Sequence, residues 1–426
     1  MYLDSTRLLG IFNFVMSLTL HAVRNRFPAL QYRDFRLLWS GQIVSLTGSR
    51  MQQTAVLWHM YQLTESAYAL GAMAVIRLIP ILVLSPLAGV IADTHDRRRV
   101  LLIAQCGLAL ISTTLAWITW AKQDTATALY VITAISAGIG CFSNPTKNAM
   151  VPNLVARRHL ANAMSINITA SHVASVAGPG AAGLILATGS IAAVYWINTV
   201  SFVFMIVPIL MMRSDHRSIG GVTRISFSAA LDGLRFIRRS PIIRSAMILD
   251  FTATFFASAT SLLPIFATEV LGVGERGYGL LSAAPAVGAV LTGALMSTFP
   301  VISGQGRLLF KAVGFYALAT VVFGISSSFW LTFAALFLTG AFDTVSMVLR
   351  HTIMQLSTPD ELRGRMTSVN MMFVMGGPRL GEAEAGLVAG LAGAPFSVVT
   401  GGIGCLAAVV LIAWRSPALR RYDGHR

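Results

Sequence analysis

Long apolar stretches alternate with short polar gaps along nearly the whole chain. An apolar run of about 20 residues crosses the ~30 Å hydrocarbon layer of a membrane as a helix. Lipid offers the backbone no hydrogen-bond partners, and the alternation typical of a barrel strand is absent, so helices are expected. The pattern predicts an all-α polytopic membrane protein with twelve transmembrane helices, at 39–63, 69–92, 100–121, 127–149, 163–187, 190–212, 245–268, 277–299, 308–326, 329–349, 366–391 and 395–414.

Positive charge is concentrated in every second gap between these stretches. All but five of the 32 Lys and Arg residues fall on one side; the exceptions are Lys122 and Arg276 on the other side and Arg50, Arg77 and Arg379 inside apolar stretches. Short loops rich in Lys and Arg face the cytoplasm, so this side and both chain termini are predicted to be cytoplasmic. The net charge of +15 is explained by contact with the anionic heads of the lipid bilayer, and nucleic acid is not expected as a partner.

The composition argues against soluble and catalytic classes of protein. Charged residues make up 12% of the 426 residues, whereas a soluble chain carries about 25%. The sequence contains no ATP-binding P-loop, no H-E-x-x-H and no G-x-S-x-G elbow, so an enzyme is not predicted. Three single cysteines without metal-ligand spacing suggest neither a metal site nor a disulfide framework. We expect no metal and no cofactor, which leaves an ion gradient or downhill flow as the means of driving any transport.

The chain divides at its longest polar gap. We predict a cytoplasmic N-terminal segment at 1–34, a six-helix bundle at 35–212, a cytoplasmic linker at 213–243, a second six-helix bundle at 244–414 and a cytoplasmic tail at 415–426. The linker contains an amphipathic helical pattern around Leu231 and Phe236 that suits the inner membrane face. For the N-terminal segment, an interfacial amphipathic helix and a misplaced start codon both remain open.

The two halves repeat weakly. Tyr68-Ala-Leu opens the second stretch and Tyr278-Gly-Leu opens the eighth, while Gly183-Leu-Ile and Gly386-Leu-Val occupy matching places in the fifth and eleventh. A parallel repeat of six plus six helices is typical of transporters that rock about a binding site near the midplane. Internal repeats also occur in folds that transport nothing.

The gap after the second stretch carries Gly89, then Asp93, then Arg97 and Arg98. Glycine lets two helices approach closely, and an aspartate is favoured near a helix N-terminus. This segment resembles the signature loop of the major facilitator superfamily, although Thr94 and Asp96 depart from the usual residues. The resemblance implies the major facilitator fold, and it implies that the loop locks the cytoplasmic side when the carrier faces outward. A basic loop that only obeys topology is the alternative.

The fifth stretch contains Gly178-Pro179-Gly180-Ala-Ala-Gly183, which has the spacing of a dinucleotide-binding fingerprint. That fingerprint requires a preceding strand and an aqueous helix start, so we reject it here. Small residues and a proline permit close helix packing and a kink. The motif also resembles one found in the drug–proton antiporters of the same superfamily, which hints at export.

The eleventh stretch carries Arg379, Glu382 and Glu384 within an otherwise apolar helix. Ionisable groups in lipid are costly and mark candidate functional sites. Arg379 and Glu382 share a helix face and form either a structural pair or part of a mechanism. Glu384 lies about 200° around the helix from Glu382 and has no local partner. A carboxylate in this setting is a candidate proton carrier.

Further charges lie in the first, second, seventh and tenth stretches, at Arg50, Arg77, Asp250 and Asp343. Three cations thus oppose four anions in the membrane, which favours pairing between helices. Glu382, Glu384, Asp343 and Asp250 are the candidate proton-coupling groups; Arg77, Arg379 and Arg50 are candidate counter-charges or substrate-binding groups. Asp250 lies near the end of its stretch and is also consistent with a side chain that merely reaches the interface.

The resemblance covers about 28–415 and is strongest to the bacterial branch of siderophore, macrolide and multidrug exporters, through Phe35-Arg-Leu-Leu-Trp39 and Thr358-Pro-Asp-Glu-Leu-Arg-Gly-Arg365. It implies a monomeric proton antiporter of the bacterial inner membrane that exports a small amphipathic molecule by alternating access. The nearest alternative is a proton-coupled importer of a nutrient or metabolite. A membrane receptor or lipid-handling protein is a further alternative, but the chain shows no appended soluble domain.

Overall fold

The computed structural model describes residues 27–213, 235–298, 303–359 and 362–424. The predictions for residues 1–26 and for most of the linker at 213–243 lie outside the described residues. Within the linker, residues 235–239 are helical. The tail packs back on the second half, because α16 (Pro417–Arg420) buries Leu419 and the amide of Gly306 donates to the Tyr422 carbonyl over 2.9 Å.

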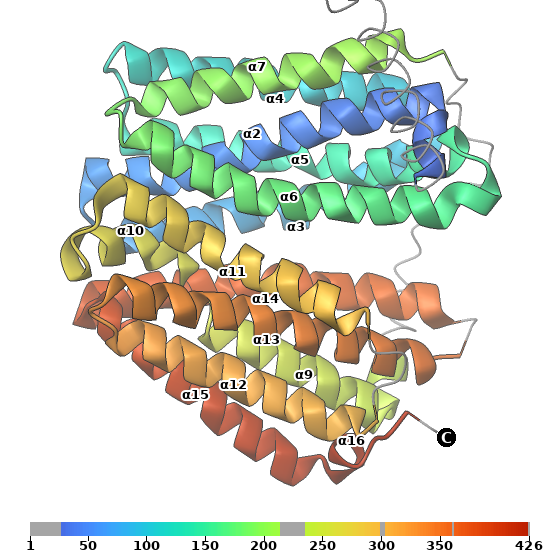
Figure 1. The fold of residues 1–426 in the computed structure, drawn as a ribbon, viewed down its shortest axis with the longest axis vertical. Coiled ribbons are helices and arrows are strands. Elements are labelled where there is room, and N and C mark those ends of the chain that lie inside the picture. The colour runs from blue at the N-terminus through green and yellow to red at the C-terminus, as the bar shows by residue number, and fades with distance from the viewer. Residues whose placement is uncertain (1–26, 214–234, 299–302, 360–361, 425–426) are drawn as a thin grey trace, which may run out of the picture.

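Twelve membrane-crossing segments follow one another along the described chain (Figure 1). The first half consists of α2 (Arg33–Thr64), α3 (Ala67–Thr94), α4 (Arg97–Trp120), α5 (Ala126–Leu154), α6 (Leu160–Leu186) and α7 (Ile191–Met211). The second half consists of α9 (Pro241–Phe256) with its continuation η3 (Thr260–Leu262), α10 (Leu263–Ile265) and η4 (Phe266–Val270), then α11 (Gly274–Met296), α12 (Gln305–Ile325), α13 (Phe329–Leu356), α14 (Arg363–Ala392) and α15 (Ala394–Arg415). No strand occurs within these ranges, and the predicted all-α fold is confirmed.

Ten of these segments are long and apolar enough by themselves to cross a membrane. The two that fall short of that apolarity are α2 and α14, which carry charged residues near their centres, among them Arg50 and Arg379. The seventh segment is interrupted after Phe256, and Pro264 lies in the first turn of its short α10. Such a break within the membrane is tolerated where the backbone is buried in protein, and Leu262, Leu263 and Phe266 are all buried.

The packing scheme of the first half is repeated in the second. In the first half, α2 packs on α6 and α7, α4 packs on α5 and α7, and α3 packs on α5. In the second half, α9 packs on α14 and α15, α12 packs on α13 and α15, and α11 packs on α13. Each of these contacts has its counterpart six segments later, which is the arrangement that the weak sequence repeat predicted. The halves meet through α3 with α14 and α6 with α11, again a symmetric pair of contacts.

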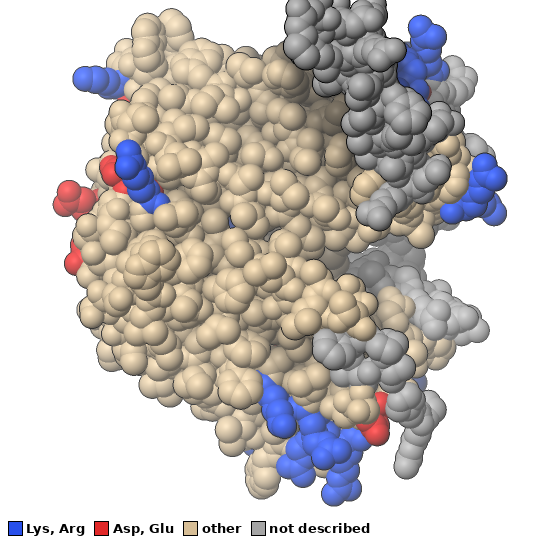
Figure 2. All heavy atoms as spheres, viewed as in Figure 1, with Lys and Arg blue, Asp and Glu red and all other residues tan. Residues whose placement is uncertain are grey.

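The two ends of the molecule differ in charge. We call the end that carries the turns 95–96, 155–159 and 357–359 and the C-terminal tail the basic end, and the end that carries 65–66, 121–125 and 326–328 the opposite end. Figure 2 shows mostly Lys and Arg at the basic end, acidic side chains together with a few basic ones at the opposite end, and on this face a broad belt without charge between them. The belt fits the hydrocarbon layer of a membrane.

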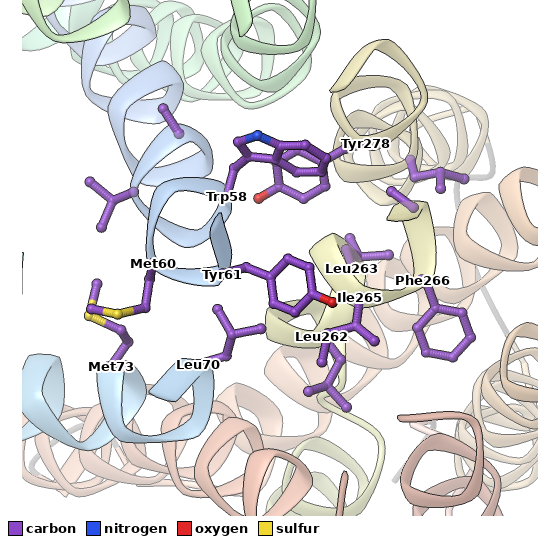
Figure 3. Packing of buried hydrophobic residues seen from close by; sticks show 14 of the residues in the cluster. Trp58, Met60, Tyr61, Leu70, Met73, Leu262, Leu263, Ile265, Phe266 and Tyr278 are labelled. Atoms are coloured by element: carbon purple, nitrogen blue, oxygen red, sulfur yellow. The ribbon is translucent and has the colours of Figure 1, made fainter. Parts of the chain in front are cut away.

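The hydrophobic core is also unequal between the two ends. The largest cluster lies at the opposite end and joins both halves, for example through Trp58 against Tyr278 and Tyr61 beside Leu263 (Figure 3). Three further clusters lie nearer the basic end, and among the described residues each belongs to one half alone. The halves are therefore closed on each other at the opposite end and hold separate cores at the basic end.

Candidate functional site between the two halves

Two glycine contacts hold the halves together near the opposite end. A Cβ added to Gly183 of α6 would lie 2.6 Å from the Cα atom of Gly279 of α11, and a Cβ added to Gly71 of α3 would lie 2.9 Å from the Cα atom of Gly386 of α14. The backbones touch because these residues have no side chain. Gly183 and Gly386 are the pair that the sequence repeat aligned, so the repeat extends to the interface itself.

The Gly178-Pro179 motif packs on both halves. A Cβ at Gly178 would lie 3.1 Å from the Thr47 carbonyl of α2, and a Cβ at Gly279 would lie 2.8 Å from the Pro179 carbonyl. Both Gly178 and Pro179 are buried inside α6. The motif thus lets α6 approach α2 within its own half and α11 across the interface, as expected of small residues used for packing.

Four charged side chains from both halves interact near the middle of the membrane. Arg77 of α3 interacts electrostatically with Arg379 and Glu382 of α14, and Arg50 of α2 interacts with Arg379. We call Arg50, Arg77, Arg379 and Glu382 the interhalf charge cluster. The structure brings these four predicted residues together, although the sequence left their pairing open.

The depth of the interhalf charge cluster follows from helix geometry. At 1.5 Å per residue, Arg77 lies about 9 Å along α3 from Gly71, and Arg379 lies about 10 Å along α14 from Gly386. Arg50 packs at Gly178, about 8 Å along α6 from Gly183. All three arginines therefore lie at a similar depth, between the glycine contacts and the basic end.

Glu382 is engaged within its own helix. Arg379 donates from a terminal guanidinium nitrogen to Glu382 Oε2 over 2.7 Å, and the two residues are one helical turn apart. Their side chains are 32% and 14% exposed, so the pair is only partly shielded. Glu384 is half-buried and has no ion-pair partner among the described residues. Glu384 therefore remains the less constrained of the two carboxylates.

A second charged group lies inside the second half. Asp250 of α9 forms an ion pair with Arg350 of α13, and each side chain is 5% exposed. Asp343 lies two helical turns from Arg350 on α13 and interacts with it electrostatically. We call Asp250, Asp343 and Arg350 the second-half triad. It contains two carboxylates and one guanidinium, so it carries an excess of negative charge when all three are ionised.

Two interpretations of the sequence are corrected by this triad. Arg350 was counted among the residues of the basic side because the apolar stretch ends at Leu349, but α13 continues to Leu356 and buries the arginine. Asp250 does not reach the membrane interface, because Arg350 holds it inside the bundle. The second half thus buries an arginine that an apolar window alone does not reveal.

The basic loop between α3 and α4 is bonded within the first half. Arg97 donates to the Ala149 carbonyl over 2.9 Å, and Arg98 donates to the carbonyls of Ile209 and Leu210 over 2.9 and 2.7 Å. Asp96 caps α4 by accepting from the amides of Arg98 and Arg99. Gly89 and Asp93 lie in the last turns of α3, and the side chain of Asp93 lies outside the described residues.

The sequence did not reveal a polar network at the opposite end. His59 of α2 lies 2.8 Å from Asp124 through Nε2 and 3.1 Å from the Tyr195 hydroxyl through Nδ1. His59 and Tyr195 are buried. Next to them, Tyr61 of α2 donates to Glu269 of the second half. These contacts join segments far apart in the chain, so no local pattern signals them.

No group of three or more potential metal-ligating side chains occurs in the part of the chain that the structure describes. The chemistry of the interhalf charge cluster is that of charge recognition, because guanidinium groups donate hydrogen bonds in a rigid planar array and keep their charge.

Comparison with known proteins establishes the family. The model of the family described as "Transmembrane secretion effector" matches residues 25–424. The chain belongs to this branch of the major facilitator superfamily. It is 24% identical over 401 residues to the enterobactin exporter EntS of Shigella boydii, an alignment that covers 91% of this chain and 93% of that protein. The same exporter from Escherichia coli O1:K1 matches at the same identity and coverage.

Solved structures share the fold. A bacterial homologue of the human lysosomal transporter Spinster, in an inward-facing and occupied conformation, has a TM-score of 0.72 at 14% identity and covers 92% of this chain and 98% of its own. A bacterial homologue of the iron transporter ferroportin, in an inward-facing state, has a TM-score of 0.69 at 15% identity and covers 90% and 98%. These structures show the fold, and the family match and the EntS relatives show that the protein is a multi-pass membrane transporter and not an enzyme, as predicted.

Proposed function

We propose that the protein exports a small amphipathic molecule from the bacterial cytoplasm by alternating access, driven by protons that move inward. The observation that carries this proposal is the unequal core. The halves share buried apolar side chains at the opposite end, whereas the clusters nearer the basic end each belong to one half. A rocking motion that separates the glycine contacts and brings the halves together at the basic end would exchange the closed end for the open one.

The orientation follows from charge. Loops rich in Lys and Arg stay on the cytoplasmic side of the inner membrane, so the basic end and both termini would face the cytoplasm. The state described here would then be open to the cytoplasm, which is where an exporter takes up its substrate. The similar EntS proteins are exporters of enterobactin, and the matching family is that of transmembrane secretion effectors; both support the same direction.

The second-half triad is the better candidate for proton coupling. Glu382, one of the expected coupling groups, is held by Arg379 in this state. Asp250 forms an ion pair with Arg350, and Asp343 interacts electrostatically with the same guanidinium without forming an ion pair. Protonation of one carboxylate would balance the charge of the group, and a change in that balance between the two states would link proton binding to rocking. Glu384 remains a second candidate because no described cation pairs with it.

The proposal is tested in inside-out membrane vesicles that contain the protein or no protein. A labelled siderophore, a labelled macrolide and a fluorescent dye are each offered outside, and the vesicle lumen is acidified. Export predicts uptake of at least one compound that depends on the pH gradient and is reduced in Asp343→Asn. Uptake of compounds by right-side-out vesicles with an acidic exterior would instead support the importer, and no protein-dependent flux in either system would refute transport of these compounds.

A further inference from the structure

The charges between the halves do not balance. In the interhalf charge cluster, the guanidinium groups of Arg50, Arg77 and Arg379 face one carboxylate, Glu382. Glu382 accepts its hydrogen bond from Arg379, which leaves Arg50 and Arg77 without a carboxylate of their own in this group. The cluster thus holds two positive charges in excess near the middle of the membrane.

The guanidinium groups of Arg50 and Arg77 also have few hydrogen-bond acceptors in the protein. The Nε atom of Arg50 is buried and has no hydrogen-bond partner, while one of its terminal nitrogens donates to Gln53 over 3.3 Å. Arg77 is partly exposed and donates no hydrogen bond to any described residue, so the buried donor without a partner is the Nε atom of Arg50. Buried polar groups normally have a partner, and a buried donor without one needs an explanation. Like charges held together in a membrane are destabilising unless an anion joins them.

We infer that the interhalf charge cluster is the binding site for an organic anion, held by Arg50 and Arg77 of the first half and Arg379 of the second. Guanidinium groups bind carboxylates in a planar, bidentate geometry. Because the arginines come from both halves, a bound anion would neutralise charge that otherwise repels across the interface. This inference rests on the proposed function for its biological meaning, since it gives the class of molecule that would be exported.

The test uses three probes with the same aromatic body: 1-naphthoate, the neutral 1-naphthamide and the cationic 1-naphthylmethylammonium. Binding to the purified protein in lipid nanodiscs is measured by isothermal titration calorimetry, with empty nanodiscs as the blank. We expect naphthoate to bind at least tenfold more tightly than either other probe. Arg77→Gln should lower naphthoate affinity at least tenfold, and Arg77→Lys should retain part of it because the charge is kept.

Arg276→Gln is the matched control. Arg276 lies in α11 near the opposite end, and it is outside the cluster, so its loss should leave naphthoate affinity unchanged. Each variant is accepted as folded by its thermal unfolding midpoint and gel-filtration profile. Arg379→Gln serves as the second cluster variant if Arg77→Gln fails to fold. Equal binding of the three probes, absence of naphthoate binding, or full affinity in the cluster variants would overturn the anion site.

The outcomes separate this inference from the proposed function. If vesicles transport a neutral or cationic compound while naphthoate shows no preference in binding, export stands and the anion site is wrong. If naphthoate binds through the arginines but no vesicle preparation transports any compound, the anion site stands and export is wrong.

Discussion

The glycine contact between α6 and α11 gives the sharpest test of alternating access. In the substitution Gly183→Ala, the new methyl group would lie 2.6 Å from the Cα atom of Gly279 and 2.9 Å from the Glu275 carbonyl oxygen. Carbon atoms pack favourably at about 3.5–4.0 Å. The two helices must therefore separate by about 1 Å in the state described here, in which the opposite end is closed.

The cost of this separation sets the size of the effect. Overpacking a well-packed site by one or more methylene-sized groups costs about 1–3 kcal/mol. In the state with the opposite end open, α6 and α11 would lie apart there and the methyl group would meet no resistance. The equilibrium between the two states should then shift by about 5- to 150-fold toward the state that is open at the opposite end, following the relation between free energy and population.

The shift can be measured with pairs of spin labels in a protein whose native cysteines have been replaced by serine. Labels at Gln123 and Ser327 report the distance between the halves at the opposite end, and labels at Arg158 and Gln355 report it at the basic end; all four residues are exposed. Gly183→Ala should populate longer distances for the first pair and shorter distances for the second. Pulsed electron–electron double resonance spectroscopy gives the distance distribution of each pair of labels.

Gly180→Ala is the control within the same motif. A Cβ at Gly180 meets no atom within 4 Å, so this variant has the same change in helix propensity without the contact. Its distance distributions should equal those of the parent protein. If Gly183→Ala also leaves them unchanged, or if both variants shift them equally, the glycine contact does not bias the two states and the reasoning from helix separation is wrong.

Three further substitutions test the other contacts. Tyr61→Phe removes the hydroxyl that donates to Glu269 across the halves. Loss of this hydrogen bond, worth about 1 kcal/mol, should lengthen the Gln123–Ser327 distances in the same assay, though less than Gly183→Ala does. An unchanged distance distribution would show that this contact does not hold the opposite end closed. Asp96→Ala removes the N-cap of α4 and should destabilise the protein by about 1 kcal/mol, seen as a lower thermal unfolding midpoint, whereas an unaltered midpoint would show that the cap is dispensable. Arg350→Met leaves Asp250 buried without its cation and should destabilise the folded protein by about 3–5 kcal/mol. The double variant with Asp250→Asn should recover much of this stability in the same thermal measurement. No recovery would argue that the two residues are not coupled.

The sequence predicted the segments of the fold well, because the membrane imposes a local rule. Each helix must satisfy its own backbone and present an apolar surface, so twelve stretches and their charge asymmetry can be recognised without tertiary information. Even α2 and α14 were recovered, although their charges lower their apolarity. The Arg379–Glu382 pair was foreseeable for the same reason, since residues three apart share a helix face.

The partners between helices were not foreseeable. Asp250 and Arg350 are separated by most of the second half, and their pairing depends on how α9 and α13 pack. Arg350 itself was misassigned because the apolar stretch ends before the helix does. The contact of His59 with Asp124 and Tyr195 joins three segments of the first half. A single sequence shows helix periodicity and the placement of charges, but it does not show which residues of different helices come into contact.

The two charged groups have opposite signs and lie in different parts of the molecule, which suggests how ion and substrate could be linked. The interhalf charge cluster spans the moving interface, whereas the second-half triad lies within one half. Helix α9 connects them: it carries Asp250, and a Cβ at Gly381 of α14 would lie 2.7 Å from the Thr254 carbonyl of α9. A shift of α9 on protonation of Asp250 would therefore be passed to the part of α14 that carries Arg379, because packed helices cannot move independently. An Asp250→Asn variant that binds naphthoate with the affinity of the parent protein at both acidic and neutral pH would argue against this route.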